Sequence, residues 1–352
     1  MIRTNLGRCG LALAIVFAAL FAAMPSGAAE DNAYTVMPLV SDQPGVAPVQ
    51  DPDLVNAWGL AASSSSPWWV ADNETSKSTL YNGNTGQKLP LTVTVGVDSG
   101  PTGIVFNGGS GFVVRNGTAF GPARFIFDGE DGLIRGWNPA VDPTNAVVAP
   151  AQGDPGAIYK GLAIAAGMLY AADFHNGVVD VFDGSWTLVN QFTDPGLPSG
   201  FAPFGIQAIG GSILVAFAKQ DADAEDEVAG VGLGFVDVFD TAGNLIARVA
   251  QRGLLNAPWG LALAPAGFGR FSGDLLVGNF GDGRINAFEP QSNGRFEFRG
   301  QLRDSSGQAI EIDGLWALEF GNGGAAGPTD TLFFTAGPDE ETHGLFGRIK
   351  AD

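Results

Sequence analysis

The histidines and the single cysteine show which catalytic chemistry is open to this chain. Its 352 residues include two histidines, His175 and His343, and one cysteine, Cys9. Each histidine lies just before a glycine, in sequences typical of turns between strands. No Gly-x-Ser-x-Gly elbow leads from a strand into a helix, and two histidines are too few for a typical zinc site. We therefore expect both histidines to be turn residues, and the sequence assigns no catalytic set.

Oxygen ligands are plentiful, and Ca²⁺ is the metal ion that they suit best. The densest group of carboxylates lies between Asp221 and Glu227, within a segment rich in glycine and acidic residues, 219–232. Its carboxylates alternate at first, as ligands in a loop can, but the segment lacks the glycine and the terminal glutamate of an EF-hand. We expect a solvated, mobile charged loop.

A repeated unit predicts the elements that must position any site. Each unit contains a small or aromatic residue, a glycine and a leucine or isoleucine, followed by short apolar strands and turns. The glycine position recurs six times at intervals of 44 to 58 residues, at Gly59, Gly103, Gly161, Gly205, Gly260 and, as alanine, Ala317. Units of this length and composition are typical of propeller blades. The sequence thus predicts an all-β, six-bladed propeller, in which glycine lets the inner strands approach one another closely.

The two ends of the repeat array predict how the ring closes. The last unit ends after its third strand, whereas one orphan strand, Tyr34–Val40, precedes the first unit. We expect this N-terminal strand to pair into the last blade as its outer strand. Residues 111–124 and the acidic segment 219–232 are expected insertions in the second and fourth units.

The N-terminal segment predicts export. Residues 1–29 contain Arg3 and Arg8, an uncharged apolar run and then small residues, which is the pattern of a signal peptide cut after Ala29. The apolar run is too short to span a bilayer, so we expect no membrane insertion. Residues 30–352 are then a single cysteine-free propeller domain, secreted or periplasmic and monomeric. The net charge of −19 would repel phosphate backbones, which argues against nucleic acid as a partner.

The repeat also resembles known propellers. The stretch Leu276–Ile285, with its Gly/Asp turn between two strands, is similar to an NHL-type repeat. Over most of its length the chain resembles a functionally uncharacterised family of exported bacterial propellers of the NHL and lactonase-like kind. The matching pieces are Asn56–Leu60, Ala123–Phe127, Gly136–Pro139, Ala257–Leu261 and Asn279–Gly283. The resemblance implies a fold and an extracytoplasmic location, but no reaction. Members often carry a C-terminal sorting signal that is absent here, and we expect a freely soluble product.

Polar residues near the propeller axis form a candidate metal site. Lactonases of this architecture hold Ca²⁺ at the axial mouth with Glu, Asn and Asp from different blades. Side chains of this kind stand before the inner strands and at the ends of the second strands, as Asn56, Asn256 and Asp313 and as Asp72, Asp173 and Asn279. They could converge on an ion, or each could cap its own turn.

Aromatic residues at equivalent positions form a candidate ligand site. Four units carry one directly before the glycine position: Trp58, Phe204, Trp259 and Trp316. A ring of these side chains at the axial mouth would suit a sugar face or an apolar ligand. The alternative is that they pack between adjacent blades.

The sequence leaves three functions open. The first is a binding module for an extracytoplasmic ligand or protein partner, using the axial mouth with its aromatic and Asx residues. The second is a metal-dependent hydrolase or lactonase, in which an axial Ca²⁺ polarises a carbonyl group. The third is a structural component of an envelope or matrix.

Overall fold

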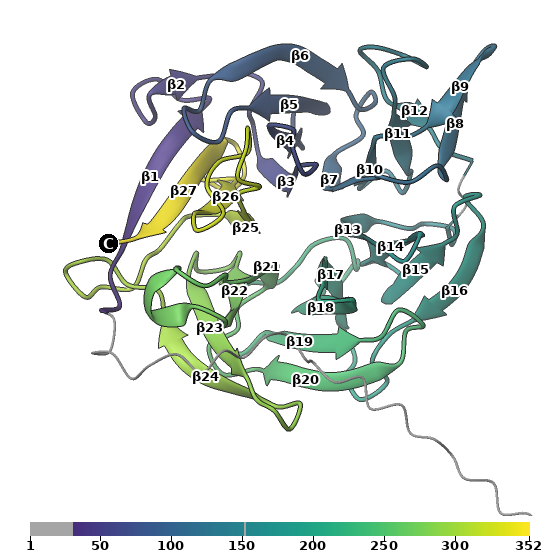
Figure 1. Cartoon of the computed structure of the whole chain (residues 1–352). Helices are drawn as coiled ribbons and strands as arrows, with labels where there is room; N and C mark the ends of the chain where they lie inside the picture. The colour runs from purple at the N-terminus through teal and green to yellow at the C-terminus, as the bar shows by residue number, and fades with distance from the viewer. Residues whose placement is uncertain (1–30, 151–152) are drawn as a thin grey trace, which may run out of the picture.

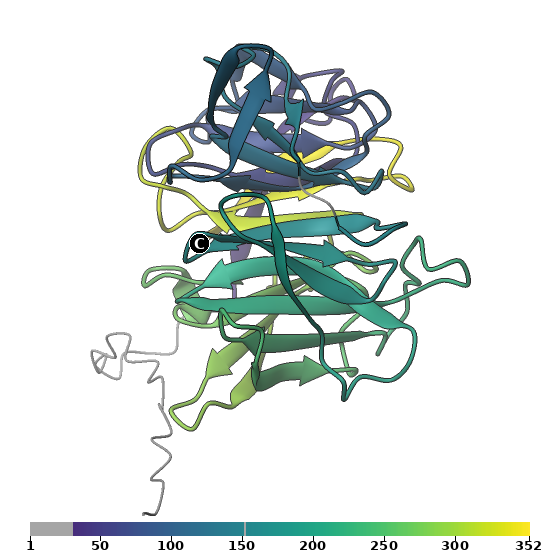
Figure 2. The ribbon, with the colours of Figure 1, turned by 90° about the vertical axis from the view of Figure 1, so that its right-hand side faces the viewer.

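The computed structural model describes residues 31–150 and 153–352, so the expected signal peptide lies outside the described residues. Six antiparallel sheets surround a central axis as blades (Figure 1). This arrangement confirms the predicted all-β, six-bladed propeller. Seen from its edge, the ring carries loops on both faces (Figure 2).

Each blade has its first strand beside the axis and its last strand at the rim. Blade 1 comprises β3 (Ala57–Ala61), β4 (Trp68–Asp72), β5 (Lys77–Tyr81) and β6 (Lys88–Thr94). Blade 2 comprises β7 (Pro101–Phe106), β10 (Phe125–Gly129), β11 (Arg135–Trp137) and β12 (Val147–Val148). The expected insertion in this blade forms a separate hairpin, β8 (Val113–Asn116) and β9 (Ala119–Pro122).

Blades 3 to 5 follow the same plan without interruption. Blade 3 comprises β13 (Tyr159–Ala165), β14 (Met168–Asp173), β15 (Val178–Phe182) and β16 (Leu188–Phe192). Blade 4 comprises β17 (Phe201–Ile209), β18 (Ser212–Lys219), β19 (Gly234–Phe239) and β20 (Leu245–Gln251). Blade 5 comprises β21 (Pro258–Leu263), β22 (Leu275–Asn279), β23 (Ile285–Pro290) and β24 (Phe296–Gln301), with the short 3₁₀ turn η1 (Gly269–Phe271) between β21 and β22.

Blade 6 joins the two ends of the described chain. It comprises β25 (Leu315–Phe320), β26 (Leu332–Ala336), β27 (Leu345–Ala351) and, antiparallel to β27, the N-terminal strand β1 (Tyr34–Ser41). The two terminal strands lie side by side in Figure 1. The predicted closure is therefore confirmed, but β1 is not the outermost strand, because the two-residue β2 (Val49–Gln50) pairs with it in parallel.

The recurrent glycine allows neighbouring inner strands to touch. A Cβ atom on Gly205 would lie 2.0 Å from the carbonyl oxygen of Trp259, in the next blade. Side-chain atoms do not approach backbone so closely, so only glycine fits at this distance. In all six blades a β-bulge interrupts the pairing of the first two strands at this same position. A bulge redirects the preceding side chain, which places that residue at the axis.

The hydrophobic core consists of six buried clusters, one at each interface between blades. Trp68 and Trp69, neighbours on β4, illustrate this arrangement. Trp68 packs on Phe333 of blade 6, and Trp69 stacks on Phe125 of blade 2 at 4.0 Å between ring centroids. Large side chains thus hold each blade to both of its neighbours. In the described part of the chain, no helix has the length and apolar character needed to cross a membrane.

Candidate functional site

The axis has two openings, which we name by the direction of the inner strands. The entry face is the face where the first strand of each blade begins, near Asn56 and Lys160. The exit face is the face where those strands end, near Gln207 and Glu319. The sequence pointed to the entry face, and its residues are described first.

The four aromatic residues meet at the axis and fill it. The rings of Trp58 and Trp316 stack at 3.7 Å, and Phe204 and Trp259 meet Trp316 edge-on at 5.7 and 6.0 Å. Phe280 stacks on the same tryptophan at 4.1 Å. All four predicted residues are buried. The structure therefore brings them together as an aromatic plug that closes the channel, with no open ring face toward solvent.

The polar residues predicted beside them make separate local contacts. Asn56 accepts a hydrogen bond from Trp316 Nε1 at 2.8 Å and donates one to Glu341 at 2.7 Å. Asn256 accepts from the backbone N–H of Gly230 at 2.6 Å, at the end of the acidic segment. Asp313 is exposed and accepts from a backbone N–H in the turn before β27, at Asp339. Asn56 alone of the three is bonded directly to the aromatic plug.

The three residues considered as metal ligands lie in blades 1, 3 and 5 and each serves its own turn or strand. Asp72 accepts from Thr79, Asp173 accepts from Asn176, and Asn279 donates to Leu254 and Asp282. These side chains share no hydrogen-bond partner. Within residues 31–150 and 153–352, no group of three or more His, Cys, Asp or Glu is placed to hold a metal ion.

A charged cluster covers the plug on the entry face. Lys160 is buried, and its Nζ lies 2.5 Å from a carboxylate oxygen of Glu130, 3.2 Å from Asp226 and 5.3 Å from the ring centre of Trp58. Burial by itself would lower the pKa of Lys160, but the nearby carboxylates outweigh it and the pKa is raised. Burial raises the pKa of Glu227 to about 8, against the opposing effect of Lys160. Several blades contribute carboxylates to this cluster. Lys160 thus neutralises part of their combined negative charge.

The acidic segment 219–232 is an ordered cover over this cluster. Gln220 donates to the carbonyl oxygen of Phe174 at 2.6 Å, and a ring nitrogen of His175 lies 3.2 Å from the carbonyl oxygen of Ala224. Several of its carboxylates are exposed, as expected, and one of these, Asp226, also reaches Lys160. The sequence did not predict these contacts, which the segment makes with residues of blade 3.

The two histidines lie in turns, as expected, and are half-buried. His343 differs from His175 in pairing with a carboxylate, because its Nδ1 lies 2.7 Å from Asp42. Asp42 also accepts from the backbone N–H of Gly344 at 2.9 Å. This contact fastens the segment after β1 to the turn before β27.

Toward the exit face, below the plug, a small chamber occupies the axis. It is lined by the six leucine or isoleucine residues that follow the glycine position, Leu60, Ile104, Leu162, Ile206, Leu261 and Leu318, together with Trp259. Its volume is about 20 Å³, which is room for one water molecule. The chamber is too small for an organic ligand.

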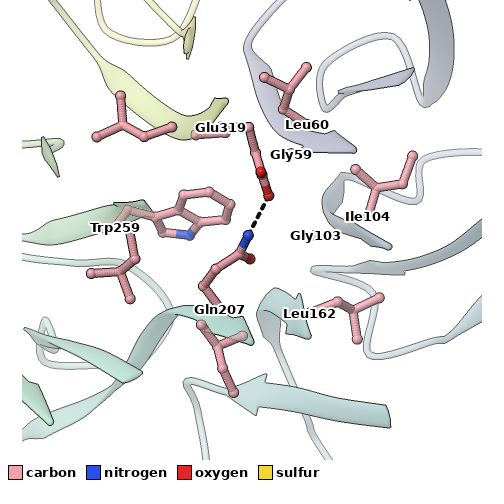
Figure 3. Close-up of a pocket in the computed structure, with 12 residues that line it drawn as sticks. Gly59, Leu60, Gly103, Ile104, Leu162, Gln207, Trp259 and Glu319 are labelled. Atoms are coloured by element: carbon pink, nitrogen blue, oxygen red, sulfur yellow. Dashed lines mark hydrogen bonds between the residues drawn. The ribbon is translucent and has the colours of Figure 1, made fainter. Parts of the chain in front are cut away.

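A polar pair forms the floor between this chamber and the exit face. The side chains of Gln207 from β17 and Glu319 from β25 point toward each other across the axis, and Gln207 Nε2 donates to Glu319 Oε1 (Figure 3). The other four blades carry Ala61, Val105, Ala163 and Ala262 at the equivalent position. Burial raises the pKa of Glu319 to about 7, and the hydrogen bond from Gln207 only partly offsets that effect.

The exit-face pocket opens on the other side of this pair. We use that name for a cavity of about 250 Å³ lined by Trp68, Phe106, Phe320, Asn322, Gln207, Glu319 and small apolar residues. None of these described lining residues is lysine, arginine or histidine. Concave sites with apolar walls and a few convergent polar groups are typical of small-molecule binding. On these grounds the exit-face pocket is the best candidate site in the structure.

Sequence reasoning missed Gln207 and Glu319. A signal for them was present, because they are the polar exceptions at a repeat position that is otherwise alanine or valine. The polar residues singled out from the sequence precede the inner strands or end the second strands, whereas Gln207 and Glu319 lie near the ends of the inner strands.

Comparison with known proteins places the chain in a family. No family model matches it. Individual proteins are similar to it in sequence, among them two of Acanthamoeba polyphaga mimivirus. Uncharacterized protein R648 is 36% identical over 330 residues, covering 89% of this chain and 79% of the viral protein. Uncharacterized protein L690 is 35% identical over 333 residues, covering 89% and 85%. The chain belongs to the family of these two proteins. The members so identified are viral, so the expected bacterial and exported character of the family stays a prediction.

Solved structures add a likeness in fold. The soluble aldose sugar dehydrogenase of Escherichia coli aligns with a TM-score of 0.54 at 11% identity, over 91% of this chain and 100% of the dehydrogenase. Virginiamycin B lyase from Staphylococcus aureus aligns with a TM-score of 0.51 at 14% identity, over 90% and 99%. At such identity these matches show the propeller fold, and nothing about activity.

Proposed function

We propose that the protein is a monomeric binding propeller that takes a small molecule into the exit-face pocket and works outside the cytoplasm. The observation that carries the proposal is the Gln207–Glu319 pair at the floor of a cavity of about 250 Å³ whose lining residues are mostly apolar in type. Apolar walls supply affinity by burying ligand surface, and the polar floor selects the orientation.

The rigidity of the fold supports binding at this place. Gln207 and Glu319 lie on strands of blades 4 and 6, and these blades are fixed by packing on their neighbours around a closed ring. Sites on strands hold side chains more exactly than sites on free loops do. The pocket is therefore preformed, and a ligand would lose little binding energy to ordering the protein.

The extracytoplasmic location rests on the sequence of residues 1–29. Expression of the full chain in a bacterial host, followed by mass spectrometry of the mature protein, tests it. We expect a product that begins at Glu30 and is found outside the cytoplasm. A full-length product retained in the cytoplasm would contradict this part of the proposal.

A pocket-filling variant tests the binding site. Ala208 lines the exit-face pocket, so Ala208→Trp should occupy part of the cavity. Ala140→Trp, at an exposed alanine outside it, is the matched control. We would titrate benzyl alcohol and benzylamine into each protein by isothermal titration calorimetry. The proposal expects saturable binding of at least one probe to the wild type and to Ala140→Trp, and its loss in Ala208→Trp. Absence of binding to the wild type, or equal binding to Ala208→Trp, contradicts it.

A further inference from the structure

The floor of the exit-face pocket carries a carboxyl group without a basic partner. Glu319 receives one hydrogen bond, from the neutral amide of Gln207. The described residues that line the pocket include no basic side chain. An ionised carboxylate in such surroundings is stabilised by any cation that reaches it, because opposite charges attract more strongly where water is scarce.

Two buried carboxylates in this protein, those of Asp237 and Asp51, have such a partner. Asp237 is bonded to the guanidinium group of Arg248, with Nε at 2.8 Å, and Asp51 lies 2.8 Å from Lys88 Nζ. In each pair the basic group balances the carboxylate charge, and neither pair borders a cavity described above. Asp72, Asp128 and Asp274 are buried without an ion-pair partner, but none of them lines the exit-face pocket. Glu319 is half-buried and differs because it combines the absence of a cationic neighbour with direct access to an open pocket.

The walls of the pocket also suit a positive charge with an organic body. Phe106 and Phe320 are half-buried aromatic residues of the lining, whereas Trp68 is almost fully buried behind it, and the remaining wall residues are mostly alanine, valine, leucine and isoleucine. Aromatic ring faces attract ammonium groups, most strongly when water is excluded. The apolar wall favours hydrocarbon over a strongly hydrated metal ion.

We propose that the ligand of the exit-face pocket is a small organic cation, an ammonium group on a compact apolar body, whose charge pairs with the Glu319 carboxylate. This inference rests on the proposed function of the same pocket and names its ligand class. Gln207 holds one carboxylate oxygen in place, and the body of the ligand packs against Phe106 and Phe320. A cavity of about 250 Å³ limits the body to roughly the size of one ring with short substituents.

Charge selectivity is the first test. We would titrate benzylamine and its neutral counterpart benzyl alcohol at pH 8 into the wild type, Glu319→Gln and Glu297→Gln. Glu297 is exposed on β24 and controls for the loss of one negative charge. The wild type and Glu297→Gln should bind benzylamine about tenfold or more tightly than benzyl alcohol, since a charged hydrogen bond contributes more than a neutral one. Glu319→Gln should lose this preference. Near-ultraviolet circular dichroism confirms that each variant is folded.

The outcomes separate the inference from the function that it extends. Equal binding of both probes to the wild type, abolished by Ala208→Trp, overturns the organic-cation ligand but leaves the binding pocket intact. Binding of neither probe contradicts both. A preference for benzylamine that persists in Glu319→Gln places the cation elsewhere and also overturns the inference.

The pH dependence of binding is a second test. Benzyltrimethylammonium carries a charge that does not titrate, so any change in its affinity reports the protein. Because burial raises the pKa of Glu319 to about 7, the affinity should rise by up to about tenfold per unit from pH 5 toward pH 7 and then level off. In Glu319→Gln the affinity should be flat over this range. A flat profile in the wild type contradicts the role of Glu319.

Discussion

Replacement of Glu319 by glutamine should stabilise the free protein, and more so at high pH. The group has an ordinary pKa of 4.5 that burial raises to about 7 in the folded protein. Between these values the folded state binds more protons than the unfolded state does. The wild type therefore loses stability as the pH rises from about 4.5 to 7, and the loss is complete above that range. Glutamine keeps the shape of the side chain without a group that titrates.

The size of the expected stability difference follows from the size of the pKa shift of Glu319. A rise from 4.5 to about 7 corresponds to about 3 kcal/mol at about 1.4 kcal/mol per pKa unit. Glu319 borders the open exit-face pocket, where water solvates part of the charge, so we reduce the expected effect to about 2 kcal/mol. For a domain of this length that free energy corresponds to a shift of roughly 3 °C in Tm.

The assay is urea unfolding of both proteins at pH 4.5 and pH 8.5. The difference in the free energy of unfolding between Glu319→Gln and the wild type should grow by about 2 kcal/mol from the lower pH to the higher. Other buried carboxyls, such as Asp128, whose pKa burial raises to about 7, are present in both proteins and cancel in the difference. The exposed control Glu297→Gln should show no such growth. A difference that does not change with pH, or that shrinks as the pH rises, would refute the reasoning.

Three further predictions concern the ring. Lys160→Met leaves the entry-face carboxylates without their central cation and should destabilise the protein by about 3 kcal/mol in urea unfolding; a variant as stable as the wild type contradicts this. Gly205→Ala places a Cβ atom 2.0 Å from the carbonyl oxygen of Trp259 and should lower the free energy of unfolding by about 3 kcal/mol or more. The control is Gly324→Ala, where the nearest atom to the new Cβ is 3.4 Å away and the free energy of unfolding should change by less than about 0.5 kcal/mol. Deletion of residues 31–42 removes β1 and should cause gross loss of stability in thermal melts; a truncated protein that melts with the full chain contradicts ring closure as a source of stability.

The propeller could be predicted because its repeat is local in sequence. Each blade is built from neighbouring strands, and a glycine, or alanine in the last unit, between an axial residue and a leucine or isoleucine marks every inner strand. A residue this small is needed because the next blade approaches the inner strand closely, as seen at Gly205. Ring closure could be predicted as well, since one strand before the first unit matches one missing from the last.

The same repeat could not tell what the axial side chains do. Trp58 and Trp316 occupy equivalent positions whether they face an open mouth or stack on each other. Their burial depends on how far the inner strands converge and on what the acidic segment covers. That segment reads as a solvated run, yet Asp226 reaches Lys160 from 66 residues away in the chain.

The sequence by itself determined the strands, the blade count and the closing strand, because these depend on residue patterns repeated within each unit. Only the tertiary structure decided the site. Gln207 and Glu319 are 112 residues apart and belong to blades 4 and 6. They meet because a closed ring points equivalent positions of its blades at one axis. The sequence marks each of them as a polar exception at its repeat position, but does not show that the two face each other.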